Sequence, residues 1–396
     1  MARTDPTPPT LPAGPPGRSG WVLSIITLAM LGLGVIMVHS ALARQAEPGA
    51  AWYARREWKH TVYAALSALI VMTAWRVDYR RIARRGGLVP FWPAAFLASA
   101  ILLAAAVHIH VPGLPFGGHA VGNRWRWLQI GSFQFQPSEL VKVGLLIFLA
   151  AWLTRMPLDR RKSIFTFLLA IVLIGLCLAP ILHEDLSVSI QISASACAAL
   201  WLAGIPWYFV ISLVLAGGAG MFALVYLSPR NWDRILVMSD PLTTTRAAGH
   251  QLKQSLLSIL SGDYLGKGLG NGAISTGGYL PEPHTDFIFA TYCEEFGLAG
   301  ASLLMLLMIL WIYQAHRAAV RSNDPFGRAL AGSLGAVYGL QMVLHMAVDL
   351  GSAPPTGMVL PFISYGGTAL LVAGTGTAMI LSVASRAGQG PLELPP

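Results

Sequence analysis

Hydrophobic residues run along this chain in long blocks separated by short polar connections. A helix needs about 20 residues to cross a hydrocarbon layer of about 30 Å, and ten blocks have a suitable length with few or no charges. We therefore expect ten membrane-spanning helices. Their approximate ranges are 21–43, 58–77, 88–110, 137–155, 164–183, 185–204, 206–227, 286–315, 328–350 and 357–385.

Composition supports this prediction. Of the 396 residues, 55% are hydrophobic and only 11% are charged, which is more apolar material than a soluble core of this length could bury. The predicted fold class is an all-α polytopic membrane protein with one membrane domain, residues 21–385. Residues 1–20 and 386–396, both containing prolines, are expected to be disordered cytoplasmic tails.

The distribution of lysine and arginine predicts the orientation, because short loops rich in these residues stay cytoplasmic. The loops after the second, fourth and eighth blocks are basic, with the first loop as a partial counterweight on the other side. Both termini are then inside, and the connections 111–136 and 228–285 face outward. The net charge of +9 suits a surface of anionic lipid, and no nucleic-acid-reading motif is present.

The most informative acid is Asp286, which lies where the long outer connection re-enters an apolar block, in Leu280-Pro281-Glu282-Pro283-His284-Thr285-Asp286-Phe287. Ionisable groups at the edge of a hydrocarbon phase usually pair, face a water-filled cavity or carry function. A simpler alternative is that Asp286 caps the start of the following helix.

Other polar groups interrupt the apolar blocks. Glu139 and Lys142 are three residues apart and share a helix face, so an ion pair is expected. Asp185 ends a short polar break between two apolar blocks. The break is either a simple outer turn, or Asp185 points into a cavity shared with Lys142 or binds a cation. Gly366 and Gly367 follow a proline at membrane depth, which favours either close helix packing or a broken helix that lines a binding site.

The outward connections add cations and aromatic rings. Arg124, Arg126, Arg230 and Arg234 are all predicted on one side, where guanidinium groups can fork onto phosphate oxygens. The tryptophans among them, including Trp127, are either interface anchors or part of such a site. Residues 251–260 predict a short amphipathic helix along the membrane surface, whereas the glycine-rich run 262–272 matches no phosphate-binding fingerprint.

Three segments together resemble the SEDS family of bacterial shape, elongation, division and sporulation proteins, the FtsW/RodA/SpoVE type. They are Gln136 to Lys142, Leu280 to Phe289 and Leu360 to Gly367, and the resemblance extends from Trp21 to Arg386. Differences lie at His183-Glu184-Asp185-Leu186-Ser187-Val188, where the family usually has Gln-Pro-Asp-Leu-Gly-Thr, and at His250, His345 and Thr368. These differences indicate a divergent FtsW-like or RodA-like paralogue.

The resemblance implies a peptidoglycan glycosyltransferase that polymerises lipid II at the outer face of the cytoplasmic membrane, beside a class B penicillin-binding protein. It implies Asp286 as the essential catalytic residue, and because glycosyl transfer needs a base to deprotonate the acceptor hydroxyl, we expect Asp286 to be that base. It leaves a requirement for Mg²⁺ or Mn²⁺ open, and we assign no metal ligand. The expected substrate-binding residues are Arg126, Trp127, Glu139, Lys142, Asp185, Arg230, Arg234, Glu282, His284 and Ser364.

Two functions from other classes stay open at the level of the sequence. A lipid II flippase would also place polar residues such as Lys142 within its helices, since such residues mark translocation paths. A non-catalytic scaffold would only position the transpeptidase, and substitutions at Asp286 would then be silent.

Overall fold

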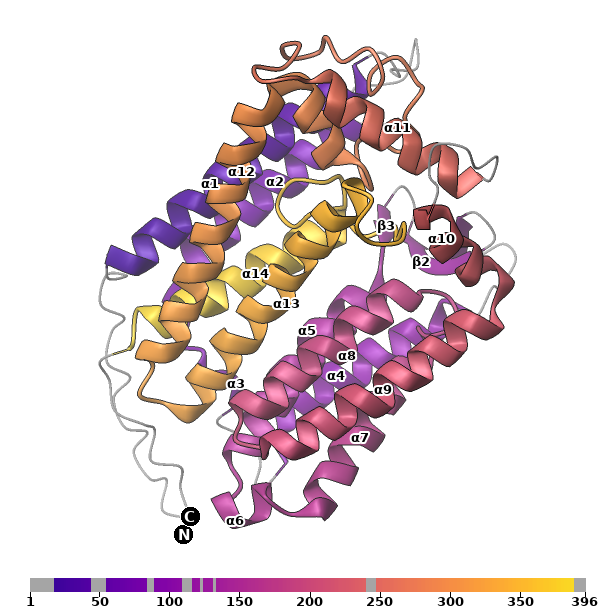
Figure 1. Cartoon of the computed structure of the whole chain (residues 1–396). Coiled ribbons are helices and arrows are strands. Elements are labelled where there is room, and N and C mark those ends of the chain that lie inside the picture. The colour runs from indigo at the N-terminus through magenta and orange to yellow at the C-terminus, as the bar shows by residue number, and fades with distance from the viewer. Residues whose placement is uncertain are drawn as a thin grey trace.

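The computed structural model describes residues 18–43, 55–83, 89–108, 116–121, 124–130, 133–239 and 247–387. Most of these residues are helical (Figure 1). Nearly all of the two tails predicted at 1–20 and 386–396 lies outside the described residues.

Each predicted apolar block contains one long helix. Among the described residues, six helices are long and apolar enough to cross a membrane, namely α1, α5, α9, α12, α13 and α14, while α4, α7 and α8 are shorter apolar helices. The long helices are α1 (Arg18–Leu42), α2 (Arg56–Thr73), α4 (Phe91–Ala106), α5 (Pro137–Thr154), α7 (Ile164–Leu178), α8 (Leu186–Leu202), α9 (Trp207–Leu227), α12 (Ile288–Arg321), α13 (Pro325–Asp349) and α14 (Gly367–Ala384). The other helical segments are η2 (Ala74–Arg76), α3 (Arg80–Ala83), α6 (Leu158–Arg161), α10 (Pro229–Ser239) and α11 (Ala247–Ser261).

The helices form two groups. In one, α1 and α13 pack against α12, and α2 packs against α14; in the other, α5 packs against α4 and α8, and α8 against α9. Helix α13 contacts both α5 and α8 and so joins the groups. Figure 1 shows α10, α11 and the strands gathered at one end of the bundle. The two longest connections therefore meet at the same end.

A small antiparallel sheet corrects the prediction of an all-α fold. Its strands β1 (Phe116–Val121), β2 (Arg124–Ile130) and β3 (Phe133–Phe135) lie in the order β1-β2-β3. Strand β2 begins Arg-Trp-Arg-Trp, an alternation with the two-residue period of a strand. Three short strands between two apolar helices give a much weaker sequence signal than the helices do, so the hydrophobic pattern predicts a loop here.

The outer connection 228–285 carries two helices. Helix α11 confirms the helix expected at 251–260, and its Ser255 hydroxyl donates a hydrogen bond to the Asp349 carbonyl at the end of α13. Helix α10 was not predicted. Residues 240–246 of this connection lie outside the described residues.

The glycine-rich run has a packing role. Inside α12, Gly297 has a non-helical backbone (φ +64°) that kinks the helix. The run lies against this kink, where the amides of Lys267 and Gly268 donate to the carbonyls of Glu294 and Glu295. A Cβ atom on Gly266 would lie 2.1 Å from the Glu295 carbonyl oxygen, which no side chain tolerates. The glycines thus permit close backbone contact, in agreement with the missing phosphate fingerprint.

The last apolar block starts its helix ten residues later than predicted. Residues 357–366 form a buried turn-rich loop, and α14 begins at Gly367. A Cβ on Gly367 would lie 2.5 Å from the ring of Tyr63, so close packing of α14 on α2 is confirmed there. Phe362 is fully buried with φ +68°, and a Cβ on Gly34 would meet its carbonyl. Irregular backbone at this depth is tolerable because protein encloses it.

Candidate functional site

Two of the segments that the sequence singled out lie side by side. The Ser364 hydroxyl donates to the Thr285 carbonyl (2.7 Å) and accepts from the Leu360 amide (2.8 Å). The Tyr365 amide donates to the His284 carbonyl (2.9 Å). The buried loop 357–366 therefore fixes the turn that carries Asp286, and Ser364 acts through the backbone of that turn.

Asp286 lies two residues before the first residue of α12 and is partly buried. A Cβ on Gly357, a residue with φ +70°, would lie 3.4 Å from Asp286 Oδ2, so this glycine borders the carboxylate. No hydrogen bond or ion pair to this carboxylate comes from the described residues. The cap of α12 is Phe287, without a side-chain hydrogen bond; Asp286 does not cap this helix.

Several charges surround Asp286. The pKa of Asp286 is raised to about 6, chiefly because burial removes surrounding water and also because of the negative charges of Glu282 and Asp185, while the positive charges of Arg126 and Arg234 partly offset the rise. A carboxyl group with a pKa near 6 can exchange a proton close to neutral pH, as a general base must. The fold thus brings Asp286, Arg126, Asp185, Arg234 and Glu282 into one electrostatic cluster.

Arg126 and Asp185 form the ion pair of this cluster. Arg126 Nη1 lies 2.9 Å from Asp185 Oδ2, and its Nε donates to the Glu184 carbonyl (3.0 Å). Asp185 also caps α8 by accepting from the Val188 amide (3.2 Å). Asp185 therefore pairs with a cation of the sheet, and a cavity shared with Lys142 stays a prediction.

Glu282 and His284 flank Asp286 in different environments. Glu282 is exposed with φ +50°, and His284 is buried with Nε2 3.8 Å from Glu282 Oε2. Burial lowers the pKa of His284, while the Glu282 charge opposes that shift. The ring of His284 also lies beside Tyr365 at 5.6 Å between centroids. His284 therefore helps to hold the turn against the loop.

The ion pair expected within α5 is confirmed, and it is enclosed. Lys142 Nζ lies 2.7 Å from Glu139 Oε2 and donates to Gln341 Oε1 (3.1 Å), with the lysine fully buried. Gln341 also accepts from Gln191 Nε2 (2.7 Å) and donates to the Val359 carbonyl (2.8 Å). This network joins α5, α8 and α13 to the buried loop.

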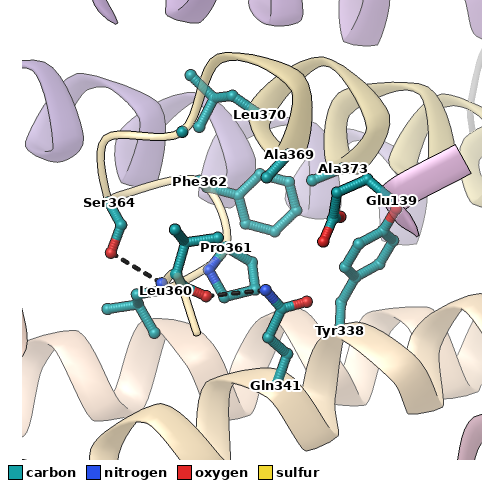
Figure 2. Close-up of a pocket in the computed structure, with 12 residues that line it drawn as sticks. Glu139, Tyr338, Gln341, Leu360, Pro361, Phe362, Ser364, Ala369, Leu370 and Ala373 are labelled. Carbon is teal, nitrogen blue, oxygen red and sulfur yellow. Dashed lines mark hydrogen bonds between the residues drawn. The ribbon is translucent and has the colours of Figure 1, made fainter. Parts of the chain in front are cut away.

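Figure 2 shows Glu139, Tyr338 and Gln341 around Leu360 and Phe362 of that loop. The cavity between them holds about 10 Å³, about the space of one water molecule. Lys142 is therefore sealed from solvent and cannot itself contact a phosphate in this conformation.

A much larger cavity lies between α2, α4, α5 and α14. It has a volume of about 830 Å³, with mostly apolar walls that include Phe96, Leu140 and Leu371. At one edge are Gln134 and Phe135 of β3, and β3 is hydrogen-bonded to β2, the strand of Arg126. The apolar cavity and the charged cluster thus share the same small sheet.

The remaining predicted residues contribute less to the geometry. Trp127 lies half-buried on β2, opposite His119 in the register. The backbone of Arg230 belongs to α10, but its side chain, like that of Arg124, lies outside the described residues. Among the described residues, no group of three or more His, Cys, Asp or Glu side chains could hold a metal ion.

Sequence reasoning missed Gln191, Gln341 and Asp349. Each is a buried polar residue within an apolar helix, and such residues are costly in a membrane unless they are paired or functional. A polar residue inside an apolar block is therefore a usable signal in the sequence, although it is weaker than that of a charged residue such as Lys142.

These features define a helical, multi-pass membrane protein with a carboxylate-centred site at one end of its bundle. A sequence profile of the FtsW/RodA/SpoVE cell cycle protein family matches residues 21–389. The chain belongs to this family, as the resemblance of its three segments implied.

Relatives and solved structures agree. A probable peptidoglycan glycosyltransferase FtsW of Alkalilimnicola ehrlichii is 32% identical over 92% of this chain and 89% of its own length. That of Coxiella burnetii is 33% identical over 92% and 95%. A chain from a peptidoglycan synthase complex shares the fold, with a TM-score of 0.74 at 24% identity over 93% of this chain and 98% of its own. The rod shape determining protein RodA of Thermus thermophilus gives a TM-score of 0.65 at 23% identity over 93% and 97%.

Proposed function

We propose that this chain is a peptidoglycan glycosyltransferase that polymerises lipid II, and that Asp286 is its catalytic base. The observation that carries the assignment of the base is the Asp286 carboxylate, which has no hydrogen-bond or ion-pair partner among the described residues, feels the charges of Arg126 and Arg234 and has its pKa raised to about 6. Relatives about one third identical over nine tenths of the chain are named probable peptidoglycan glycosyltransferases, which supports the reaction class.

In the proposed reaction, Asp286 takes the proton of the GlcNAc 4-hydroxyl of one lipid II. The resulting oxygen attacks the anomeric carbon of the MurNAc at the end of the growing strand. The bond from that carbon to the prenyl diphosphate breaks, and the diphosphate leaves with its electron pair. A single displacement inverts the α-linked donor to a β-glycoside, so no covalent enzyme intermediate is needed.

Arginines of the cluster would hold the leaving diphosphate, since guanidinium groups match phosphate oxygens geometrically. Arg126 and Arg234 are the groups whose charge acts on Asp286, and we include Arg230 and Trp127 on their position in the sequence. Arg126 has two further acceptors, Asp185 and Glu184, that orient its fork. A divalent cation could add charge at the diphosphate, but no step depends on one.

Glu139, Lys142 and Ser364 act at a distance from the sugar in this proposal. The Lys142 amine is buried against Glu139 and Gln341, and Gln341 in turn binds the loop that holds Thr285 through Ser364. These residues keep the loop in place beneath the site. Glu282 and His284 shape the turn and its charge.

The apolar cavity of about 830 Å³ is a fitting place for part of a prenyl chain. Apolar pockets of this size bury most of a hydrophobic ligand's surface and leave polar groups at one edge to orient it. With the tail between α2, α4, α5 and α14, the diphosphate would lie near the sheet that bears Arg126.

The remaining proposals concern topology and partners. All ten apolar helices cross the cytoplasmic membrane, with both termini inside and the connection 228–285 outside. Residues 21–385 are then one membrane domain. A class B penicillin-binding protein is the proposed partner for crosslinking, because the chain of similar fold comes from a complex in which polymerization and crosslinking are coordinated.

A flippase is the main alternative. It would need Lys142 or Asp185 on a water-filled path through the bundle, yet Lys142 is fully buried and Asp185 is paired with Arg126. We therefore favour polymerisation over transport.

The deciding experiment measures glycan synthesis from lipid II by the purified full-length chain, with and without its transpeptidase. General base catalysis contributes roughly 100- to 10,000-fold, so Asp286→Asn should lose at least about 100-fold in rate. Asp159→Asn, an exposed acid on α6, is the matched control and should remain active. Near-normal synthesis by Asp286→Asn would refute the base. Silence of Asp286→Asn in vivo would favour the scaffold, and lipid II transport without polymerisation would favour the flippase.

A further inference from the structure

A buried histidine and aspartate near the end of α13 lie behind the proposed base. Asp349 is completely buried, and His345, one turn earlier, is 1% exposed. His345 Nε2 lies 3.7 Å from Asp349 Oδ2. Neither residue belongs to the site described above, and a histidine at 345 is one of the positions where this chain differs from the family pattern.

Asp349 supplies what the start of α12 lacks. The first amides of a helix have no partner within the helix, and a side chain at the cap position normally accepts from the second or third of them. The cap residue here is Phe287, which has no acceptor. Asp349 Oδ2 accepts from the Ala290 amide (3.0 Å), the third amide of the helix. The aspartate thus caps α12 from the neighbouring helix.

His345 contacts the segment on the other side of the base. Its Nδ1 lies 2.7 Å from the Met358 carbonyl, and since a carbonyl only accepts, Nδ1 carries the proton. Met358 follows Gly357, the residue beside Asp286 Oδ2. Two buried residues one turn apart on α13 therefore contact both segments that border Asp286: Asp349 the first turn of α12, and His345 the loop at 357–358.

We propose that Asp349, with His345 behind it, is a positioning residue that fixes the Asp286 turn between α12 and the loop 357–366. The inference rests on Asp286 being the base. Asp349 does not touch the sugar or the diphosphate in this proposal. Its carboxylate fixes the first turn of α12, and the His345 ring fixes the loop at Met358 on the other side of Asp286.

The test compares a variant without an acceptor with one that keeps it. Asp349→Leu removes the acceptor for the Ala290 amide, whereas Asp349→Asn retains an oxygen of similar reach. Misplacement of a reacting group by about 1 Å can cost roughly 100-fold in rate. We therefore expect Asp349→Leu to lower kcat for lipid II polymerisation by about 10- to 100-fold, with KM changed by less than about twofold, because substrate binding is left intact.

The conservative variant should restore function. Asp349→Asn should stay within about threefold of the wild-type kcat, since the capping oxygen remains. Asp324→Leu is the matched control: Asp324 is also a buried aspartate, which accepts from the Gly327 amide (3.1 Å) at the other end of α13. It should reduce stability without the selective loss of kcat. Equal losses in Asp349→Leu and Asp349→Asn, or none in either, would overturn the proposal.

A structural readout separates this inference from the proposed function. Hydrogen exchange of the peptide covering 286–295 should speed up in Asp349→Leu but not in Asp349→Asn. This measurement holds even if Asp286→Asn proves active and the base assignment fails. If Asp349→Leu does not fold, the variant His345→Leu provides the test. It keeps the cap on α12 but removes the contact with the Met358 carbonyl, so kcat should fall while hydrogen exchange at 288–291 is unchanged. Wild-type kcat in a folded His345→Leu would contradict the role of the pair.

Discussion

Two carboxylates of this molecule touch the same loop and are in opposite states. Glu139 is buried and lies 2.7 Å from Lys142 Nζ, within a network that also satisfies Gln341. Asp286 is partly exposed, and no hydrogen bond or ion pair from the described part of the chain reaches it. The first charge is neutralised by its partner, whereas the second is balanced only by arginines at longer range.

The difference separates a structural charge from a chemical one. A buried charge with a complete set of partners contributes to one fixed arrangement of the helices, and it has little capacity left for a substrate. A carboxylate whose partners are incomplete keeps a raised pKa and free lone pairs. The sequence placed both residues in the candidate site, but only the environment of Asp286 suits proton transfer.

The largest effect should follow from breaking the buried pair. Lys142→Met leaves the Glu139 carboxylate buried without its cation, and removal of one partner of such a pair costs about 3–5 kcal/mol. The double variant Glu139→Gln/Lys142→Met removes both charges and should recover most of that loss. Thermal unfolding in detergent, followed by tryptophan fluorescence, measures both. Equal destabilisation of the single and double variants would show that the pair does not act as a unit.

A smaller effect, on activity, should follow from Arg126. Hydrogen bonds to charged groups contribute about 1.5–3 kcal/mol, so Arg126→Gln should lower kcat/KM by roughly 10- to 100-fold. Arg126→Lys keeps the charge but cannot serve both Asp185 and the Glu184 carbonyl, and should recover only part of the loss. Removal of this cation should also raise the pKa of Asp286. Arg321→Gln, an exposed arginine at the far end of α12, is the control. Full activity in Arg126→Gln would exclude Arg126 from the site.

The hydrophobic pattern predicted the positions of the long helices because each apolar block is long and bounded by charges or prolines. The pattern failed at 357–366, where an apolar stretch forms a buried loop instead of a helix. The loop contains Pro361 and packs closely against Gly34 through Phe362. Such packing between segments far apart in sequence leaves no trace in the hydrophobic pattern. It also missed the sheet, whose strands are stabilised by pairing with each other.

The residues of the candidate site were predictable individually, but their partners were not. The Glu139–Lys142 pair lies within one helix turn, so spacing alone was sufficient. Asp185 pairs with Arg126 across 59 positions of sequence, and no local spacing indicates a partner that distant. Asp349 acts on α12 from α13, a relation that depends on helix packing and has no local signal.

Asp286 should also affect stability, by a modest amount. Its pKa is raised in the folded protein from 3.8 to about 6, so ionisation of Asp286 disfavours the fold. The contribution of this group to stability is most favourable below about pH 4 and is lost as pH rises through about 6. Discounted for partial exposure, the shift corresponds to about 1–2 kcal/mol. Asp286→Asn should therefore be more stable than wild type at about pH 8, and the advantage should shrink near pH 5. Lower stability of the variant at both pH values would mean that the carboxylate has a structural partner.

The smallest expected change concerns Glu282, whose exposed charge raises the pKa of Asp286. A base must be ionised, so polymerisation should fall as pH drops through about 6. In Glu282→Gln the pKa of Asp286 should fall, so the loss of activity at acidic pH, the acidic limb of the pH profile, should move to lower pH. The shift should be less than about one pH unit, because exposed charges interact weakly through water. The shift should shrink further in high salt, which screens the pair. Asp263→Asn, another exposed acid of the outer connection, should leave the limb in place. A shift of the limb toward higher pH in Glu282→Gln would contradict the assigned charge relation, since removal of a neighbouring negative charge can only make Asp286 easier to ionise.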